Sequence, residues 1–136
     1  MRGMINLLGP LFTRAFKPGA SEVKSVLLDS VSDSSTRATV LTPTSGKKAR
    51  IISCSIRSGS STVTGIEVYF DTGANIRTNA GKEIAEVVLD AVDLPTIFLV
   101  WPDSGGPVGA VDEVISLRTG ANITNNVVVV IHYREE

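Results

Sequence analysis

The feature that most restricts the fold of this chain is a series of short segments in which apolar and polar residues alternate. One segment, 65–71, sets apolar residues at every second position: Ile66, Val68 and Phe70. Another, 126–134, does the same with Val127, Val129, Ile131 and Tyr133. A period of two places neighbouring side chains on opposite faces of an extended strand, so each segment predicts a strand with one buried face.

Turn-forming residues separate these segments at intervals of about 8–12 residues, which favours an all-β sandwich or barrel over alternating β and α units. The expected strands are 23–31, 37–41, 49–57, 65–71, 82–89, 96–101, 113–119 and 126–134. Eight short strands match an eight-stranded β-sandwich of the jelly-roll type. Residues 21–136 are enough for one domain with its own core. The expected fold is therefore an all-β jelly roll with an extended N-terminal arm, residues 1–20.

Four details of this scheme carry separate expectations. In segment 49–57, the alternation predicts that Ile52, Cys54 and Ile56 share the buried face. Segment 96–101 is apolar on both faces, which is typical of a central strand. Segment 82–89 alternates, but a short helix also fits it. Two loops are expected, a clear turn at 42–47 and a long flexible loop at 102–107, because both contain Pro, Ser and Gly.

The first 20 residues differ from the rest because they are apolar and basic and contain no acid. Gly9-Pro10 and Pro18-Gly19 argue against a long helix. Each large apolar side chain gains about 1.5–3 kcal/mol on full burial, so we expect the arm to pack either on its own domain or on a partner. The candidate partner-binding residues are Met4, Ile5, Leu7, Leu8, Leu11, Phe12, Arg14 and Phe16.

Charge is segregated along the chain, although the net charge of −1 predicts no general attraction to nucleic acid. Between residues 34 and 66 there are five basic residues and no acid, whereas between 82 and 113 there are seven acids and one base. This pattern fits two solvated faces, or complementary edges that meet between neighbouring copies. No apolar run reaches the roughly 18–20 residues of a membrane helix, so no membrane partner is expected.

A pentapeptide, TGANI, occurs at 72–76 and again at 119–123, each time after an alternating segment, so one turn chemistry is expected at two corners. With the preceding Asp71, the first copy resembles the active-site motif of retroviral-type aspartic proteases, in which two carboxylates share one proton. The second copy has Arg118 in the place of Asp71, so the turn does not require the acid. A protease is therefore a remote alternative.

Other chemistry finds little support in the sequence. His132 is the single histidine, Cys54 is the single cysteine, and no nucleophile elbow, Walker loop or dinucleotide-binding glycine pattern occurs. Asp103, Asp112 and Glu113 are spaced irregularly for a calcium site. We expect no catalytic, cofactor-binding or metal-binding residues, and a protein that is not an enzyme. Cys54 is expected to be a small core residue.

Two stretches resemble a known family. The segment 42–52, TPTSGKKARII, looks like the opening of small jelly-roll decoration, or cement, proteins from the capsids of tailed bacteriophages. Segments 115–121 and 127–133 are similar to the closing hairpin of that family. The resemblance covers residues 40–136, whereas the arm has no counterpart, and the acidic stretch 83–93 and the loop 102–107 depart from the family pattern.

The resemblance implies a homotrimer that stabilises a viral shell by binding the major capsid protein and copies of itself. It further implies synthesis in the host cytoplasm and a final location on the capsid surface of the virion. An alternative is a carbohydrate- or receptor-binding β-sandwich module of a phage tail or surface complex, for which Trp101 and Tyr69 are the obvious platforms.

Overall fold

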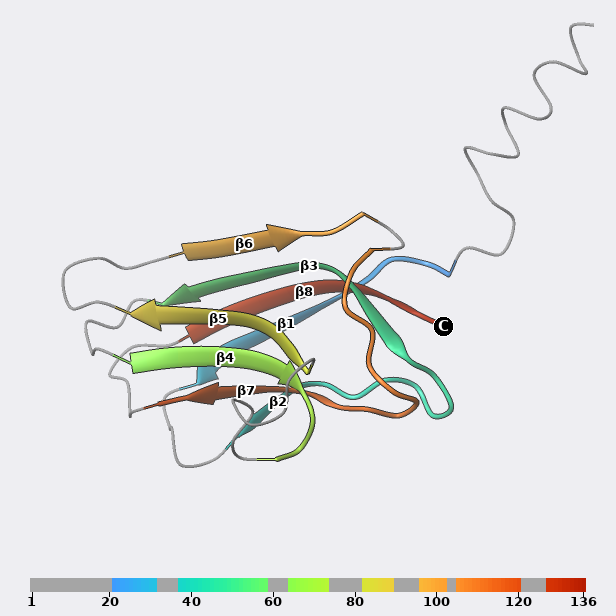
Figure 1. Cartoon of the computed structure of the whole chain (residues 1–136), viewed down its shortest axis with the longest axis horizontal. Helices are drawn as coiled ribbons and strands as arrows, with labels where there is room; N and C mark the ends of the chain where they lie inside the picture. Colours follow the sequence, from blue (N-terminus) through green and yellow to red (C-terminus); the bar gives the residue numbers. More distant parts are fainter. Residues whose placement is uncertain are drawn as a thin grey trace, which may run out of the picture.

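The computed structural model describes residues 21–31, 37–58, 64–73, 82–89, 96–102, 105–120 and 127–136. These residues form eight strands and no helix, in two stacked layers (Figure 1). The strands are β1 (Lys24–Val31), β2 (Ala38–Leu41), β3 (Ala49–Ser58), β4 (Thr64–Phe70), β5 (Glu83–Leu89), β6 (Thr96–Val100), β7 (Ile115–Thr119) and β8 (Val127–Glu135). The expected all-β, eight-stranded architecture is confirmed. The arm, residues 1–20, lies outside the described residues.

The strands form two antiparallel sheets of four. Sheet A has the order β1-β8-β3-β6, and sheet B has the order β2-β7-β4-β5. The first strand pairs with the eighth, the second with the seventh, the third with the sixth and the fourth with the fifth. This nested pairing is the topology of a jelly roll, as the strand count predicted.

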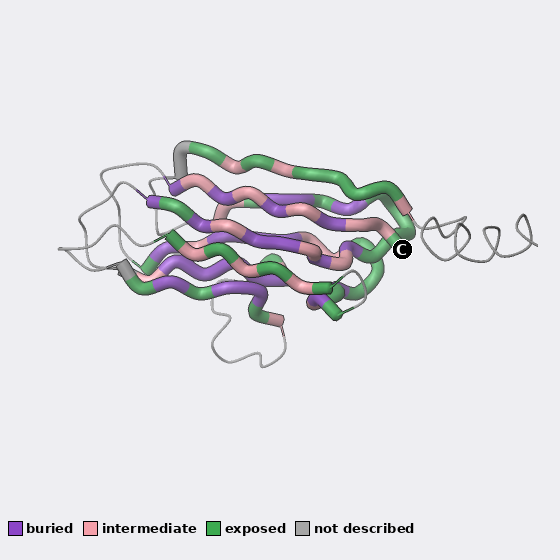
Figure 2. Tube along the Cα trace, turned by 90° about the horizontal axis from the view of Figure 1, so that it is seen from above, coloured by how far each residue is buried: buried purple, intermediate pink, exposed green. Residues whose placement is uncertain are grey.

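The core lies between the sheets and is built from every second residue of most strands, so buried and less buried residues alternate along the tube in Figure 2. The inward sets expected in β4 and β8 are confirmed, because Ile66, Val68, Val127, Val129 and Ile131 are fully buried. Cys54 is fully buried in the same cluster, as expected.

The expectation for β3 was wrong at one position. Ile51 pairs with Tyr133 and Ser53 pairs with His132, so Ile52 is an extra residue in a β-bulge. A bulge shifts the alternation by one residue. Ile51 therefore occupies the buried face that the simple alternation gave to Ile52, which is half-buried.

Two ambiguous segments are decided by pairing and position. Segment 82–89 forms strand β5 and not a helix, because it pairs with β4. Segment 96–101 forms β6 at the edge of sheet A, where β3 is the one described strand that pairs with it, so the prediction of a central strand was wrong. Ile97 and Leu99 pack against the core, while Phe98 and Val100 point outward and are exposed. β6 is therefore apolar on both faces although it lies at the edge of the sheet and not at its centre.

The two predicted loops also differ in outcome. Residues 44–47 form the expected turn: the Lys47 N–H donates to the Thr44 carbonyl (2.9 Å), and Gly46 has a φ of 80°, which glycine adopts without strain. The described part of the 102–107 loop is packed and not loose. The Ile51 N–H donates to the Pro107 carbonyl (2.9 Å), and Gly106 is buried. This loop follows β6 and continues the edge of sheet A beside β3.

Candidate functional site

The partner-binding residues that the sequence predicts, Met4 to Phe16, lie outside the described residues. The surfaces that the described residues offer to a partner are the outer faces and edges of the two sheets. Among the described residues, no cluster of His, Cys, Asp and Glu side chains has the make-up of a metal site. None of the described residues belongs to a helix that is long and apolar enough to cross a membrane.

The outer face of sheet A, which points away from sheet B, carries a row of side chains that crosses all four strands. Leu27 on β1 is in register with Val130 on β8, Val130 with Ser55 on β3, and Ser55 with Phe98 on β6. Leu27 and Phe98 have exposed fractions of 64% and 67%. Large apolar side chains this exposed, at both ends of one row, indicate a surface that is suited to contact another chain.

A second row lies beside the first on the same face. Ser25, His132, Ser53 and Val100 are in register across the sheet, and Val100 is 61% exposed. The Ser53 hydroxyl and His132 Nδ1 form a hydrogen bond of 2.8 Å, so these two polar groups satisfy each other within the face. The second row thus has an exposed apolar residue, Val100, at β6 and a hydrogen-bonded polar pair, Ser53 and His132, at its centre.

The outer face of sheet B has a different character. Glu67 on β4 is in register with Arg118 on β7, an opposite charge, and with Glu86 on β5, a like charge. Arg37 donates to the hydroxyl of Ser116 (3.1 Å), next to this row. Glu67 and Ser116 are nevertheless buried, so this part of the face is polar but covered. Among the described residues, the strands of sheet A present three large exposed apolar side chains on the outer face (Leu27, Phe98 and Val100), and those of sheet B present one (Val88), so the two faces differ in degree.

The four edge strands also differ. A free edge is normally protected by charged residues, by proline or by short length, because its backbone groups otherwise pair with another chain. β1 carries Lys24 and Asp29, β5 carries Glu83 and Glu86, and β2 has four residues. β6, with the sequence TIFLV, has no charge, no proline and two exposed apolar side chains. It is the least protected of the described edges.

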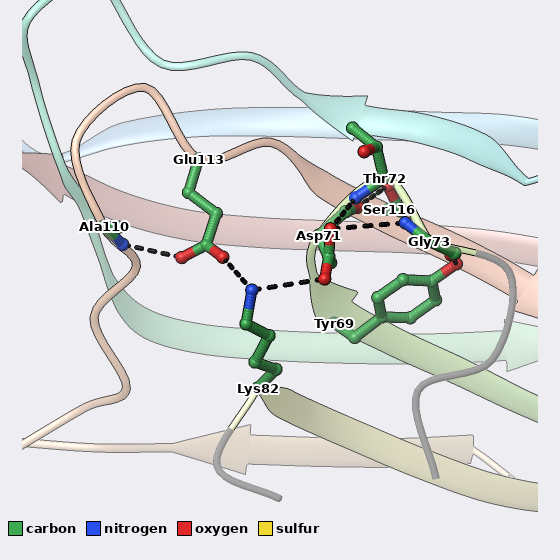
Figure 3. Close-up of polar contacts among 8 residues, drawn as sticks. All are labelled: Tyr69, Asp71, Thr72, Gly73, Lys82, Ala110, Glu113 and Ser116. Atoms are coloured by element: carbon green, nitrogen blue, oxygen red, sulfur yellow. Dashed lines mark hydrogen bonds and ion pairs between the residues drawn. The ribbon is translucent and has the colours of Figure 1, made fainter. Parts of the chain in front are cut away.

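Asp71, the acid of the protease-like motif, is held by three donors (Figure 3). Its carboxylate accepts the N–H groups of Thr72 (2.6 Å) and Gly73 (3.3 Å) and the ammonium of Lys82 (3.2 Å). These bonds lower the pKa of Asp71, the Thr72 N–H contributing most. They also hold the residue at a φ of 147°, which is rare outside glycine. Protease chemistry requires a carboxyl group that can hold a shared proton, whereas Asp71 is stabilised as an anion that shapes a turn.

Glu113 completes this cluster. One oxygen accepts from Lys82 (2.7 Å) and the other from the Ala110 N–H (2.6 Å) (Figure 3). A shallow hollow of ≈ 300 Å³ lies beside it, lined by residues 71–72 and 110–114. The nearby Asp112 accepts from the Gly46 N–H (2.6 Å). Two of the three carboxylates considered for calcium are therefore used in turns, and the third, Asp103, lies outside the described residues.

A second ion-pair cluster fixes the start of β1 to the end of β8. The Glu135 carboxylate accepts the Lys24 ammonium (2.5 Å) and both the N–H and the hydroxyl of Thr44 (2.8 and 2.9 Å). The hydrogen bond from Lys24, followed by that from the Thr44 N–H, lowers the pKa of Glu135 to about 2. Arg134 donates to the Ser21 carbonyl. The point at which the arm joins the domain is therefore anchored.

The aromatic residues considered for sugar binding do not form open platforms. Tyr69 is fully buried, and its hydroxyl donates to the Gly73 carbonyl (2.7 Å). Trp101 is half-buried and packs against the core cluster. A sugar stacks on an exposed aromatic face. The described surface thus gives the carbohydrate-binding alternative no support.

Two four-stranded sheets with nested pairing define the class of fold as a jelly roll, which occurs in viral capsid and lectin domains. The comparison with solved structures agrees. The chain is similar to a chain of the acid-stable capsid of Helicobacter pylori bacteriophage KHP30, with 10% identity, a TM-score of 0.57, and coverage of 85% of this chain and 89% of that chain. At this identity the likeness shows a capsid-type fold.

Two further viral structures are similar at lower scores. The cyanophage Pam1 capsid matches with 15% identity, a TM-score of 0.43, and coverage of 86% of this chain and 87% of that chain. The particle of the extra small virus of the prawn Macrobrachium rosenbergii matches with 12% identity, a TM-score of 0.45, and coverage of 85% and 79%. No family model matches the chain, and no curated protein sequence matches it.

Proposed function

We propose that this chain is a structural protein of a viral capsid, and more specifically a decoration protein that stabilises the shell by binding neighbouring capsid subunits. The observation that carries the proposal is the set of exposed apolar side chains on the outer face of sheet A, Leu27, Phe98 and Val100, two of which lie on the edge strand β6. A surface of this kind favours contact with other chains over catalysis. The capsid-type fold supports the same reading.

The partners in this proposal are the major capsid protein and copies of the chain itself, arranged as a homotrimer on the virion surface after synthesis in the host cytoplasm. The arm residues Met4 to Phe16 are the proposed partner-binding residues, since their apolar side chains gain from burial. A non-enzymatic role fits the engagement of Asp71 and Glu113 in turns and ion pairs.

Co-sedimentation with shells of the major capsid protein from the same virus tests the proposal. The full chain should pellet with the shells, and a variant that lacks residues 1–17 should stay in the supernatant while its far-UV circular dichroism stays that of a folded β domain. Equal pelleting of both forms would remove the arm from the proposal. A full chain that never pellets would overturn the capsid role.

A further inference from the structure

We propose that the free edge of β6 and the outer face of sheet A bind the N-terminal arm of a second copy of this chain. The inference rests on the proposed function and deepens it, because it names both halves of the contact between copies. Its occupant is residues 4–16 of the neighbouring copy, and its receiving surface is centred on Phe98 and Val100.

The hydrogen-bonding pattern of β6 shows which backbone groups are available. The Trp101 N–H points toward β3, where it donates to the Ile52 carbonyl (2.8 Å). Successive residues of a strand direct their backbone groups to opposite sides, so Phe98 and Val100 direct theirs away from β3. No described strand lies on that side. An extended segment can therefore add to β6 as a fifth strand of sheet A.

The side chains agree with the backbone. Phe98 and Val100, which direct backbone groups to the free edge, also present 67% and 61% of their surface on the outer face. An added segment would thus gain main-chain hydrogen bonds at the edge and apolar contacts on the face at the same positions. The arm has seven large apolar side chains within 13 residues. These side chains match the apolar character of Phe98 and Val100.

Charge complementarity in the sequence points the same way. The arm has three basic residues, Arg2, Arg14 and Lys17, and no acid. The stretch from 90 to 103, which includes β6, has three acids, Asp90, Asp93 and Asp103, and no base. Opposite charges in the two stretches of sequence favour contact between them and oppose an arm-to-arm contact.

The attachment point of the arm is compatible with exchange between copies. The arm joins the domain at Ser21, next to β1, and β1 and β6 are the opposite edges of sheet A. An arm on its own domain would have to turn back and cross β1, β8 and β3, a width of about 14 Å, before it reached β6. The 20 residues of an arm span at most about 66 Å, so the arm of a neighbouring copy can also reach β6. Such head-to-tail contacts can close into a ring, as a homotrimer requires.

Mixing two defective variants tests the proposal in solution without shells. One variant lacks residues 1–17 and keeps the receiving surface. The other carries Phe98→Ser and Val100→Ser and keeps the arm. A matched control carries Val88→Ser and Val111→Ser, which remove exposed apolar side chains (62% and 51% exposed) away from this face. Light scattering coupled to size-exclusion chromatography measures the mass of each protein and of the mixture.

The full chain and the matched control should have three times the mass of one chain, and each defective variant alone should be monomeric. The mixture should form a 1:1 dimer, because it contains one intact arm and one intact surface. A monomeric mixture, or an arm-deleted variant with the mass of the full chain, would overturn the proposal. So would a full chain that is monomeric at all concentrations. Co-sedimentation with shells is independent of these outcomes, so the capsid role can fail or stand separately.

Discussion

Gly106 occupies a position in which the structure leaves no room for a side chain. A Cβ atom added there would lie 1.8 Å from the carbonyl oxygen of Ile51 and 3.3 Å from the Cβ of Trp101. The first of these neighbours is backbone and cannot rotate away. The same segment supplies the Pro107 carbonyl that accepts the Ile51 N–H (2.9 Å), so Gly106→Ala must move the loop away from β3.

The cost of Gly106→Ala follows from these contacts. Overpacking costs about 1–3 kcal/mol, and loss of the hydrogen bond from Ile51 costs about 1 kcal/mol more. We expect the free energy of unfolding to fall by about 2–4 kcal/mol, which lowers the melting temperature by roughly 10 °C. Urea and thermal unfolding, followed by far-UV circular dichroism, measure both quantities.

The adjacent Gly105 provides the control. A Cβ at Gly105 would have its nearest neighbour, Pro102 Cδ, at 3.5 Å, which is an ordinary contact. Gly105→Ala should therefore change the free energy of unfolding by less than about 0.5 kcal/mol. If the two alanine variants were equally stable, the packing of this loop against β3 would be refuted.

Three further predictions concern the core and its ion pairs. Ile131→Ala removes a fully buried side chain and should lower the free energy of unfolding, measured in urea, by about 2–5 kcal/mol. Val130→Ala, on the outer face, should lower it by less than about 1 kcal/mol. Similar losses in the two variants would contradict the assigned faces. The pKa of Glu135 is lowered from 4.5 to about 2, so the stability it contributes is present above pH 4.5 and lost as the pH falls to 2. Glu135→Gln should therefore lower the urea midpoint at pH 7 but not at pH 2, and an equal loss at both would oppose this assignment. Burial raises the pKa of the Cys54 thiol to about 12. At pH 8, an aromatic disulfide reagent should therefore leave this thiol unmodified in the folded protein and react with it fully in denaturant. Rapid reaction with the folded protein would contradict the burial of Cys54.

The all-β character and the inward sets of β4 and β8 could be predicted from the sequence, because they depend on local geometry. An extended chain places alternate side chains on opposite faces wherever it occurs. Ile66 and Ile131 are therefore buried for a reason that is visible in their own segments. The turn at 44–47 was predictable on the same ground, since its glycine adopts the conformation that the turn requires.

The candidate site was only partly visible in the sequence. The apolar arm was recognised from residues 1–20, and its role stays a prediction. The surface on β6 that we propose to receive the arm was missed, because a segment that is apolar on both faces was interpreted as a central strand. The same pattern fits an edge strand whose outer face contacts another chain, and the distinction depends on strand order.

What the sequence alone determined about this protein is the set of strands and, in strands such as β4 and β8, the buried face, because that information lies within a few consecutive residues. The tertiary structure decided which strands are edges, where β3 bulges, and which of two adjacent glycines must stay glycine. It also decided that Asp71 shapes a turn and that Lys24 meets Glu135, 111 residues away. Each of these depends on segments that are distant along the chain, and alternation shows which side of a strand is apolar but not what lies against it.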